Sequence, residues 1–400
     1  MSINNFLEAF IKRESLFKNK AALQSSYIPE EIPHREEQMT LIAKVLAPCL
    51  RMERPSNLFI YGKTGSGKTL TVQNTIKQIE LIAKREQIPV KFIYINCKLK
   101  KVADTEYRLI AEITRFFGRE IPPTGLPTDE VYKIFYRTIE RENQIIILIL
   151  DEIDQLVKKV GDEIIYNLTR INTELKNSKL GIIGISNDVM FADNLDPRVK
   201  SSLSEEELVF PSYNAIQIQD ILKKRSSESI KEGVMEEGVI AKCAAYAARE
   251  HGDARRALEL LRVAVELAER KTLQHVTLKE LDEAEDKIEK DRVLDMVVAQ
   301  PRQFQLILYT IILISEKSKT ESLFTGDVYD LYKTLCGKTN LRPLTQRRVS
   351  DVIGEFDISG IINARVISKG RYGRTREIKL VTGEHITAKI KTLLENIFNA

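Results

Sequence analysis

The sequence predicts an α/β domain with a parallel five-stranded sheet, followed by an all-helical segment and a smaller C-terminal domain of helices and a β-hairpin. Five segments of β-type composition alternate with helical segments, and no two-residue hairpin turn joins any pair, which is typical of a parallel sheet. A glycine-rich loop at residues 62–69 separates the first strand from a helix. From residue 213 to 281 the pattern is helical throughout, and beyond residue 300 three helices precede two alternating strands.

Composition indicates two or three domains in a soluble chain. The 400 residues are 43% hydrophobic, which is enough for sizeable cores. No run of eighteen apolar residues occurs, and residues 1–15 lack the apolar stretch of a signal peptide, so we expect an intracellular, cytoplasmic protein. The four cysteines are scattered without C-x-x-C spacing and are expected to be reduced and buried.

Positive charge is concentrated at the C-terminal end. The net charge is +4, and residues 301–400 carry 16 Lys and Arg against 10 Asp and Glu, whereas the first 300 carry 45 against 47. A basic C-terminal domain beside a nearly neutral body indicates a nucleic-acid partner. The alternative is an ordinary solvated surface, because the excess is small.

The loop at residues 62–69 has the pattern G-x-x-x-x-G-K-T. In this pattern glycines let backbone N–H groups surround phosphate oxygens, Lys68 reaches the β- and γ-phosphates, and the Thr69 hydroxyl coordinates Mg²⁺. An apolar strand at 58–61 and a helix at 70–82 flank the loop, so the positive end of the helix also favours an anion. The alternative is a glycine-rich turn with a solvated lysine. The predicted phosphate cradle consists of Thr64, Gly65, Ser66, Gly67, Lys68, Thr69 and Leu70.

Two acidic residues follow the most apolar strand. Residues 145–150 are wholly apolar and end in Asp151 and Glu152, where ligands of open α/β sheets bind. We expect Asp151, with Thr69, to hold the Mg²⁺ shell and Glu152 to polarise the water that attacks the γ-phosphate. The alternative is that both carboxylates only stabilise a helix N-terminus.

The remaining elements of the first domain follow in order. Residues 1–26 contain a short amphipathic helix, and an extended segment with two prolines at 27–38 leads into a helix at 39–50. The other predicted strands lie at 90–96, 180–186 and 205–210, and helices at 104–117 and 130–141. Three prolines and two glycines at 118–129, together with the aromatic and basic residues up to 136, indicate an exposed insertion.

The helical segment begins near residue 213. We expect helices at 216–226, 239–251 and 253–270, with Gly252 ending one helix and Asp253 capping the next. A charged helix at 279–292 is the expected connector. The predicted domains therefore comprise residues 1–211, 212–296 and 297–400.

The C-terminal domain has the order of a winged helix. Helices at 304–315, 326–337 and 345–356 precede strands at 361–367 and 376–381, with Thr345 as N-cap of the third helix. The third helix is expected in the major groove and the basic tip on the backbone or minor groove of DNA. The alternative is an exposed hairpin with lysines for solubility. The candidate DNA-binding residues are Gln346, Arg347, Arg348, Lys369, Arg371, Tyr372, Arg374 and Arg376.

These motifs together resemble the AAA+ initiator family that unites archaeal origin-recognition and cell-division-control proteins with the largest eukaryotic origin-recognition subunit. The resemblance covers nearly the whole chain and includes PHREEQ at 33–38, GISND at 184–188 and GDARRAL at 252–258. It implies an AAA+ domain with a helical lid and a winged helix.

The resemblance also implies roles for individual residues. In the family, the segment that includes PHREEQ helps to seat adenosine. Arg35 in this motif, and Tyr27 and Ile28 at the start of the same extended segment, are therefore expected at the nucleotide. Asn187 corresponds to sensor 1, which orients the attacking water, and Arg255 to sensor 2, which reaches the γ-phosphate.

Three further parts of the chain acquire roles from the same resemblance. Tyr213 and Arg225 correspond to nucleotide contacts at the start of the lid, and the insertion at 118–136 to an element that touches DNA. Arg198 resembles an arginine finger acting on a neighbouring subunit. Relatives carry an arginine further along, where this chain has Ser201 and Ser202, which leaves the role of Arg198 open.

The function implied is that of an ATP-dependent replication initiator on origin duplex DNA, with ATP/ADP as a switch, slow hydrolysis, and a paralogue and the replicative helicase as partners. A winged-helix transcriptional regulator with a vestigial site is one alternative, against which the intact Lys68, Asp151, Glu152, Asn187 and Arg255 argue. A clamp-loader-like ATPase is another, which would not explain a C-terminal winged helix.

Overall fold

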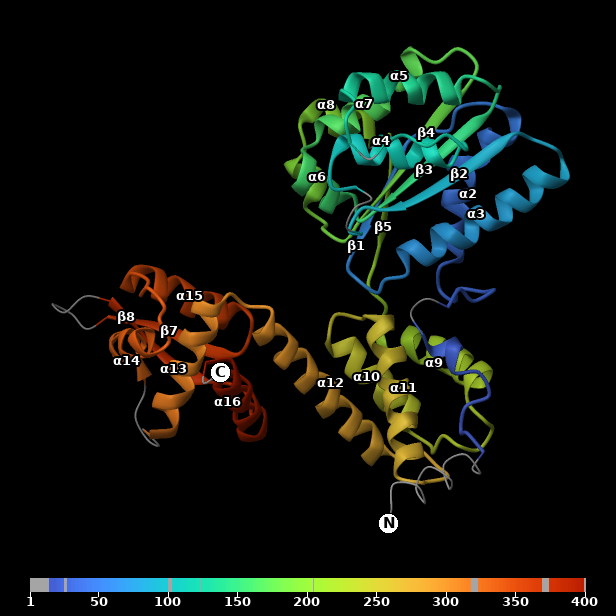
Figure 1. The fold of residues 1–400 in the computed structure, drawn as a ribbon. Helices are drawn as coiled ribbons and strands as arrows, with labels where there is room; N and C mark the ends of the chain where they lie inside the picture. The colour runs from blue at the N-terminus through green and yellow to red at the C-terminus, as the bar shows by residue number, and fades with distance from the viewer. Residues whose placement is uncertain are drawn as a thin grey trace. The chain divides into compact units, whose positions relative to one another are not determined.

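The chain divides into two compact units between Asp282 and Glu283, and the first unit contains a parallel sheet (Figure 1). The structure, a computed structural model, describes residues 14–24, 27–99, 103–122, 124–203, 205–317, 323–368 and 374–398. Its strands are β1 (Leu58–Gly62), β2 (Val90–Asn96), β3 (Ile145–Asp151), β4 (Lys179–Ser186) and β5 (Glu206–Phe210), in the order β2-β3-β4-β1-β5 with all neighbours parallel. The predicted five-stranded parallel sheet is confirmed.

Both faces of the sheet are covered by helices (Figure 1). On one face lie α2 (Glu36–Leu46) and α3 (Lys68–Arg85); on the other lie α4 (Glu106–Arg115), α5 (Thr128–Ile139), α6 (Ile153–Val160), α7 (Glu163–Arg170) and α8 (Pro197–Leu203). All seven residues of β3 are buried, alternate side chains entering the two cores. Burial on both faces explains why β3 reads as a continuous apolar run.

The insertion contributes to the core through its aromatic residues. Phe135 on α5 is fully buried, and the half-buried Tyr132 donates from its hydroxyl to Glu106 Oε1 at 2.6 Å. Lys133 and Arg137 face solvent on the same helix. DNA contact by the insertion therefore stays a prediction that depends on its basic residues rather than on its aromatic ones.

The lid consists of α9 (Ala215–Ser229), α10 (Val239–Arg249), α11 (Ala254–Arg270) and the beginning of α12 (Leu278–Val298). The segment 14–24 packs against it: Phe17 bridges to Ile230, and Lys20 pairs with Glu266 at 2.9 Å. This segment thus belongs to the helical layer, although the sequence assigned it with the sheet. The division at residues 211 and 296 stays a prediction, and the helix expected near the N-terminus lies largely outside the described residues.

The second unit contains α13 (Arg302–Lys317), α14 (Thr325–Lys338), α15 (Gln346–Ile358) and α16 (Glu384–Phe398) around a sheet of β6 (Leu323–Phe324), β7 (Ile362–Ser368) and β8 (Arg374–Leu380). The sheet is antiparallel with order β6-β8-β7. The three helices and the hairpin are as predicted; β6 and α16 were not anticipated. Short 3₁₀ helices occur at Lys20–Leu23, Ala47–Arg51, Ile171–Thr173 and Phe191–Asn194.

The four cysteines are free and buried, as predicted. Among the described residues, no helix combines the length and the apolar character that crossing a bilayer requires.

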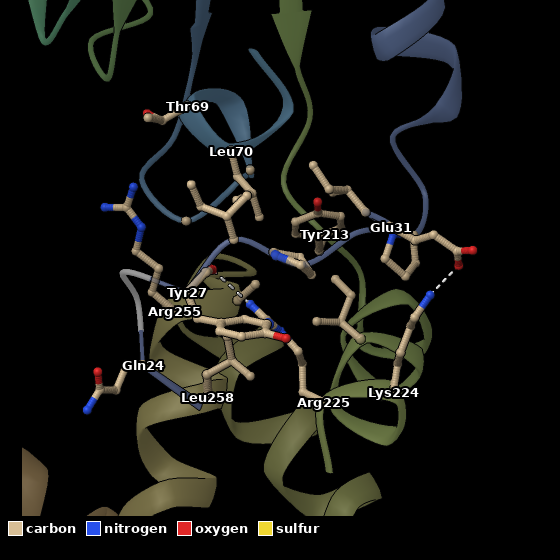
Figure 2. Close-up of a pocket in the computed structure, with 18 of the residues that line it drawn as sticks. Gln24, Tyr27, Glu31, Thr69, Leu70, Tyr213, Lys224, Arg225, Arg255 and Leu258 are labelled. Carbon is tan, nitrogen blue, oxygen red and sulfur yellow. Dashed lines mark hydrogen bonds and ion pairs between the residues drawn. The ribbon is translucent and has the colours of Figure 1, made fainter. Parts of the chain in front are cut away.

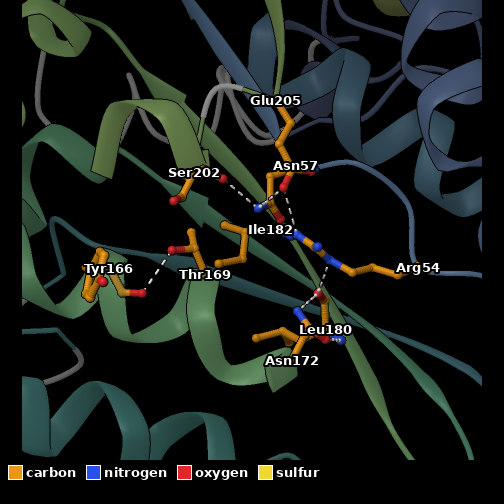
Figure 3. A network of polar contacts seen from close by, with 9 residues as sticks. All are labelled: Arg54, Asn57, Tyr166, Thr169, Asn172, Leu180, Ile182, Ser202 and Glu205. Atoms are coloured by element: carbon orange, nitrogen blue, oxygen red, sulfur yellow. Dashed lines mark hydrogen bonds and ion pairs between the residues drawn. The ribbon is translucent and has the colours of Figure 1, made fainter. Parts of the chain in front are cut away.

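A polar network joins the amino ends of three strands (Figure 3). Asn57, fully buried before β1, accepts from the Ile182 N–H at 2.9 Å and donates to the Ser202 carbonyl at 2.8 Å. Its own N–H donates to the Glu205 carboxylate at 2.7 Å, and Arg54 bonds both Glu205 and the Leu180 carbonyl. One side chain therefore fixes β4 and the end of α8 to the start of β1.

We expect Asn57→Ala to lower the free energy of unfolding by about 2 to 3 kcal/mol, because it removes the side-chain partner of the buried Ile182 N–H and of the partly buried Ser202 carbonyl. Urea-induced unfolding of the full chain measures the change. Asn194→Ala is the matched control. It removes one exposed hydrogen bond from the side-chain amide to the Met190 carbonyl and should change the free energy of unfolding by less than about 0.5 kcal/mol. Equal effects of the two substitutions would contradict the structural role of the network.

Glu140 holds the turn before β4 through three backbone donors. Its carboxylate accepts from the N–H groups of Lys176, Asn177 and Ser178 at 3.0 to 3.2 Å. Burial raises the pKa of Glu140, but these donors outweigh it, so the pKa lies below its ordinary value. A lowered folded-state pKa stabilises the protein above the unfolded-state pKa, and this contribution disappears as the pH falls through the folded-state value.

We expect Glu140→Gln to cost on the order of 1 kcal/mol near pH 7, since the group is partly exposed. The difference between wild type and variant should shrink as the pH is lowered from about 5 toward 3. Thermal unfolding across this range measures it, with Glu142→Gln as control because Glu142 is exposed beside Lys91. A difference independent of pH would exclude a role for the charge.

Candidate nucleotide-binding site

The loop at residues 62–69, hereafter the P-loop, connects β1 to α3. Gly65 and Gly67 adopt positive φ values of 73° and 89°, which residues with a Cβ rarely adopt. Lys68 Nζ donates to the carbonyls of Gly62 and Lys63 at 2.7 and 2.9 Å. Burial lowers the pKa of Lys68 to about 8, and the nearby charge of Arg255 contributes in the same direction. The Lys68 and Arg255 charges are therefore close enough to repel each other, and an anion bound between them would offset this repulsion.

Asp151 at the end of β3 lies beside the P-loop. Its Oδ2 accepts from the Thr69 hydroxyl at 2.9 Å and from the Tyr94 hydroxyl at 2.5 Å, while Oδ1 accepts from the Glu152 N–H at 2.9 Å. Sequence reasoning missed Tyr94, which β2 brings next to β3. Burial and the neighbouring Asp151 carboxylate raise the pKa of the Tyr94 phenol, so it stays a donor.

The donors at this point fit a magnesium ion bound together with phosphate. A hydroxyl and a carboxylate oxygen are hard ligands of the kind Mg²⁺ prefers, and Mg²⁺ usually keeps several waters and takes further ligands from phosphates. Within the described ranges, no cluster of three or more His, Cys, Asp or Glu side chains could hold a metal ion.

Two polar residues flank Asp151. Glu152 caps α6 in a left-handed conformation, φ 55°, and its Oε2 lies 3.6 Å from Lys98 Nζ. Asn187 is exposed directly after β4, the strand between β3 and β1. Asn187 is therefore at the carboxyl edge of the sheet, between Asp151 and the P-loop.

A cavity of about 340 Å³ opens between the P-loop and the lid (Figure 2). Nine of the residues predicted at the nucleotide line it: Tyr27, Ile28, Gly65, Gly67, Thr69, Leu70, Tyr213, Arg225 and Arg255. Gln24, Gln73, Lys224, Glu228 and Leu258 line it as well, and the sequence did not point to them.

Arg225 is the most unusual of these groups. It is 5% exposed, its guanidinium lies 4.6 Å from the centre of the Tyr27 ring, and Nη2 donates to the Tyr27 carbonyl at 3.3 Å (Figure 2). Nη1 is buried and has no hydrogen-bond partner in the described parts of the chain. A buried donor without a partner destabilises the protein, and an acceptor bound in the cavity would remove this cost by bonding Arg225 Nη1.

Arg255 enters from the first turn of α11. Asp253 caps that helix by accepting from the N–H groups of Arg255 and Arg256, as predicted. The lid touches the P-loop here: Ala254 N donates to the Gly65 carbonyl at 3.3 Å, and a Cβ at Gly65 would lie 1.8 Å from Asp253 Oδ1. Figure 2 shows Arg255 extending from the lid along the cavity wall.

Some predicted residues do not line the cavity, among them Lys68, whose Nζ is bonded to P-loop carbonyls. Arg35 is buried and bonded to backbone carbonyls. Thr64 is exposed, and Ser66 Oγ donates to the Lys63 carbonyl. Arg198 is 74% exposed and pairs with Asp196 at 3.1 Å, so a role for it on a neighbouring subunit stays a prediction.

The candidate DNA-binding residues of the second unit divide into exposed and packed groups. Thr345 caps α15, as predicted, and Gln346 and Arg347 are exposed in its first turn. Arg348 lies 3.6 Å from Glu355 and over the Phe304 ring.

Arg376 braces the hairpin against α15. Its Nε donates to Ser350 Oγ at 3.3 Å, and its guanidinium lies over Gly354. Lys369, Arg371 and Tyr372, and the side chain of Arg374, lie outside the described residues.

Three domain families match the chain. They are the AAA domain over residues 51–185, the Cdc6 AAA+ ATPase-type lid domain over 219–286 and the CDC6 C-terminal winged helix domain over 295–389. The ORC1-type DNA replication protein of Pyrococcus furiosus is 51% identical over 384 residues, 95% of this chain and 90% of the relative. ORC1-type DNA replication protein 1 of Archaeoglobus fulgidus is 49% identical over 385 residues, 96% of this chain and 93% of the relative.

A solved structure with the same fold is that of the Aeropyrum pernix ORC1 protein in complex with DNA. It is 41% identical, with a TM-score of 0.83 over 97% of this chain and 99% of that one. Because near-50% identity extends over almost the full length and all three domains match, this chain belongs to the AAA+ family of ORC1/Cdc6-type DNA replication initiators.

Proposed function

We propose that this initiator binds ATP and ADP with Mg²⁺ between the P-loop and the lid, hydrolyses ATP slowly, and uses the nucleotide state to control its grip on origin duplex DNA. The observation that carries the proposal is the convergence of Thr69, Arg225 and Arg255 on one cavity, with Lys68 directly before Thr69 at the start of α3. The start of α3 and the lid helices α9 and α11 thus meet at one cavity, and a triphosphate would neutralise the charges of Lys68 and Arg255.

The cavity suits a nucleoside triphosphate in both its parts. P-loop N–H groups and Lys68 would hold the phosphates, while Tyr27, Ile28 and the Arg225 donor would hold the nucleoside. Thr69 and Asp151 would hold Mg²⁺, which supplies charge neutralisation at the phosphates.

Hydrolysis would depend on Glu152 and Asn187. The Glu152 carboxylate, 20% exposed, is available to accept a proton from water. Asn187 would orient that water, and Arg255 would stabilise negative charge on the transferred phosphoryl group. Arg198 would perform the corresponding task on a neighbouring copy, which requires an assembly on DNA.

DNA binding would use α15 and the β7–β8 hairpin. The related Aeropyrum ORC1 protein, at 41% identity, has been solved in complex with DNA, and Arg347 is exposed at the start of α15. Phosphate contacts would give a salt-dependent affinity, and a few side chains in the groove would give base discrimination. The protein would act in the cytoplasm on the chromosome, with a paralogue and the replicative helicase as further partners.

The experiment that tests the proposal is footprinting of the purified protein on chromosomal candidate origins with ATP, with ADP and with Lys68→Ala. Protection of discrete origin repeats that changes with nucleotide in wild type, and does not change in Lys68→Ala, is the expected result. A footprint insensitive to nucleotide would contradict the switch. Uniform weak binding to all sequences would contradict origin recognition.

A further inference from the structure

The chain crosses between the sheet layer and the lid twice. The first crossing, residues 27–35, leads from the lid-bound segment 14–24 to α2. The second, residues 211–214, leads from the end of β5 to α9. Any movement of the lid relative to the sheet must bend or carry both crossings.

Arg35 bonds both crossings and the P-loop. Arg35 is 2% exposed, and its Nε donates to the Ser66 carbonyl at 2.9 Å. Nη1 donates to the His34 carbonyl at 3.2 Å and Nη2 to the Pro211 carbonyl at 2.6 Å. Because Arg35 is itself part of the first crossing, its guanidinium joins that crossing to the P-loop and to the second crossing.

Aromatic rings fix the plane of this guanidinium. Tyr213 lies 3.9 Å from it and Phe210 5.4 Å, ring centre to Cζ. The Tyr213 hydroxyl lies against the P-loop, 2.7 Å from where a Cβ at Gly67 would stand, and the Tyr213 carbonyl lies 2.2 Å from where one at Gly252 would stand. The second crossing is thus packed between the P-loop and the start of α11.

The chemistry of the contacts requires arginine. Three carbonyls in different directions need a planar fork of N–H donors, which the single ammonium of lysine cannot provide. Arg35 does not line the cavity, and its bonds go to backbone carbonyls, which account for its burial without a nucleotide contact. Because burying a cation is costly unless it is well bonded, the position points to a connection between the segments.

The Ser66 carbonyl is the point through which phosphate can act. Ser66 C=O and Gly67 N–H belong to one planar peptide unit and point in opposite directions. Gly67 is in the loop whose N–H groups close around phosphates. Turning this peptide to aim its N–H at a phosphate oxygen necessarily moves the carbonyl that Arg35 holds.

We propose that Arg35 is a positioning residue that transmits occupation of the P-loop to both hinge crossings of the lid. The proposal rests on the nucleotide binding proposed above. A direct route from phosphate to lid also exists through Arg255, so the test must separate the two routes.

The test is hydrogen–deuterium exchange of the full chain with and without saturating Mg²⁺–ADP, for wild type, Arg35→Lys, Arg255→Ala and Arg54→Lys. In wild type, ADP should slow exchange at least threefold in the P-loop and in both crossings, and in Arg255→Ala the protection of the crossings should change only in proportion to that of the P-loop. In Arg35→Lys the P-loop should stay protected, while the ADP-dependent protection of the crossings, residues 27–35 and 211–214, should fall below half of the wild-type value. Arg54 also donates to a backbone carbonyl, that of Leu180, but it lies at the amino ends of the strands and not at the P-loop. Arg54→Lys should therefore behave as wild type.

The outcomes are distinguishable. Absence of P-loop protection in wild type would overturn nucleotide binding itself. If Arg35→Lys keeps wild-type protection of both the P-loop and the crossings, the inference is overturned while nucleotide binding stands. The same holds if the crossings lose protection in Arg255→Ala but not in Arg35→Lys. If Arg35→Lys does not fold, Mg²⁺–pyrophosphate on Arg255→Ala decides: protection of the P-loop without the crossings overturns the proposal, and protection of both supports it.

Discussion

Glu152→Gln is expected to bind ATP with nearly wild-type affinity and to lower its turnover by at least about 100-fold, the usual contribution of a general base. The substitution keeps the size of the side chain and the left-handed cap of α6 at φ 55°. It removes the carboxylate that would accept a proton from water, while the Asp151 contacts to Thr69 and Tyr94 do not involve Glu152. Binding by fluorescence titration and phosphate release in single-turnover assays measure the two effects.

The matched control is Glu163→Gln, since Glu163 is an exposed acid in the first turn of α7. It should leave both binding and turnover unchanged. Turnover that persists in Glu152→Gln would assign the proton acceptor to another group, and a parallel loss of ATP affinity would mean that Glu152 serves binding instead.

The parts of the site that the sequence predicted are those encoded in contiguous residues. The P-loop pattern and the apolar run of β3 ending in Asp151 each contain their own chemistry, and parallel pairing then brings both to one edge of the sheet. Asp253 and Thr345 were likewise recognisable as caps, because capping depends on neighbours two or three residues away.

Residues defined by tertiary contacts could not be predicted from the sequence. Tyr94 looks like any strand aromatic until β2 pairs with β3 and its hydroxyl meets Asp151. Arg35 was assigned to the nucleotide because its motif resembles a segment that seats adenosine in the family, whereas its bonds to the Ser66 and Pro211 carbonyls depend on tertiary structure. The packing of Phe17 on the lid was similarly invisible, since its partner Ile230 is remote in sequence.

The same distinction applies to Arg376 in the winged helix. A run of cations at the hairpin indicates nucleic acid from composition alone, but Arg376 bonds Ser350 and covers Gly354 on α15. Composition counts charge without showing which cations are already engaged. Arg347 is exposed, and its position in the first turn of α15 makes it the better candidate for a base contact.

We expect Arg347→Ala to weaken binding to origin duplex by about 10- to 100-fold, because a guanidinium bonded to a base edge contributes about 1 to 3 kcal/mol of discrimination. Fluorescence anisotropy with specific and scrambled duplexes over a salt series measures it. A base contact predicts a large loss on the specific duplex, a small loss on the scrambled one and an unchanged salt slope. A phosphate contact predicts equal losses and a slope smaller by about 1.

The control for charge is Lys44→Ala, which removes an exposed cation from α2 in the first unit and should leave both duplexes bound as in wild type. The control for folding is the thermal transition, which Arg347→Ala should not shift because the side chain is exposed. Unchanged affinity of Arg347→Ala for the specific duplex would remove α15 from the interface. DNA recognition would then have to depend on the basic residues of the hairpin or on those of the insertion, such as Lys133 and Arg137.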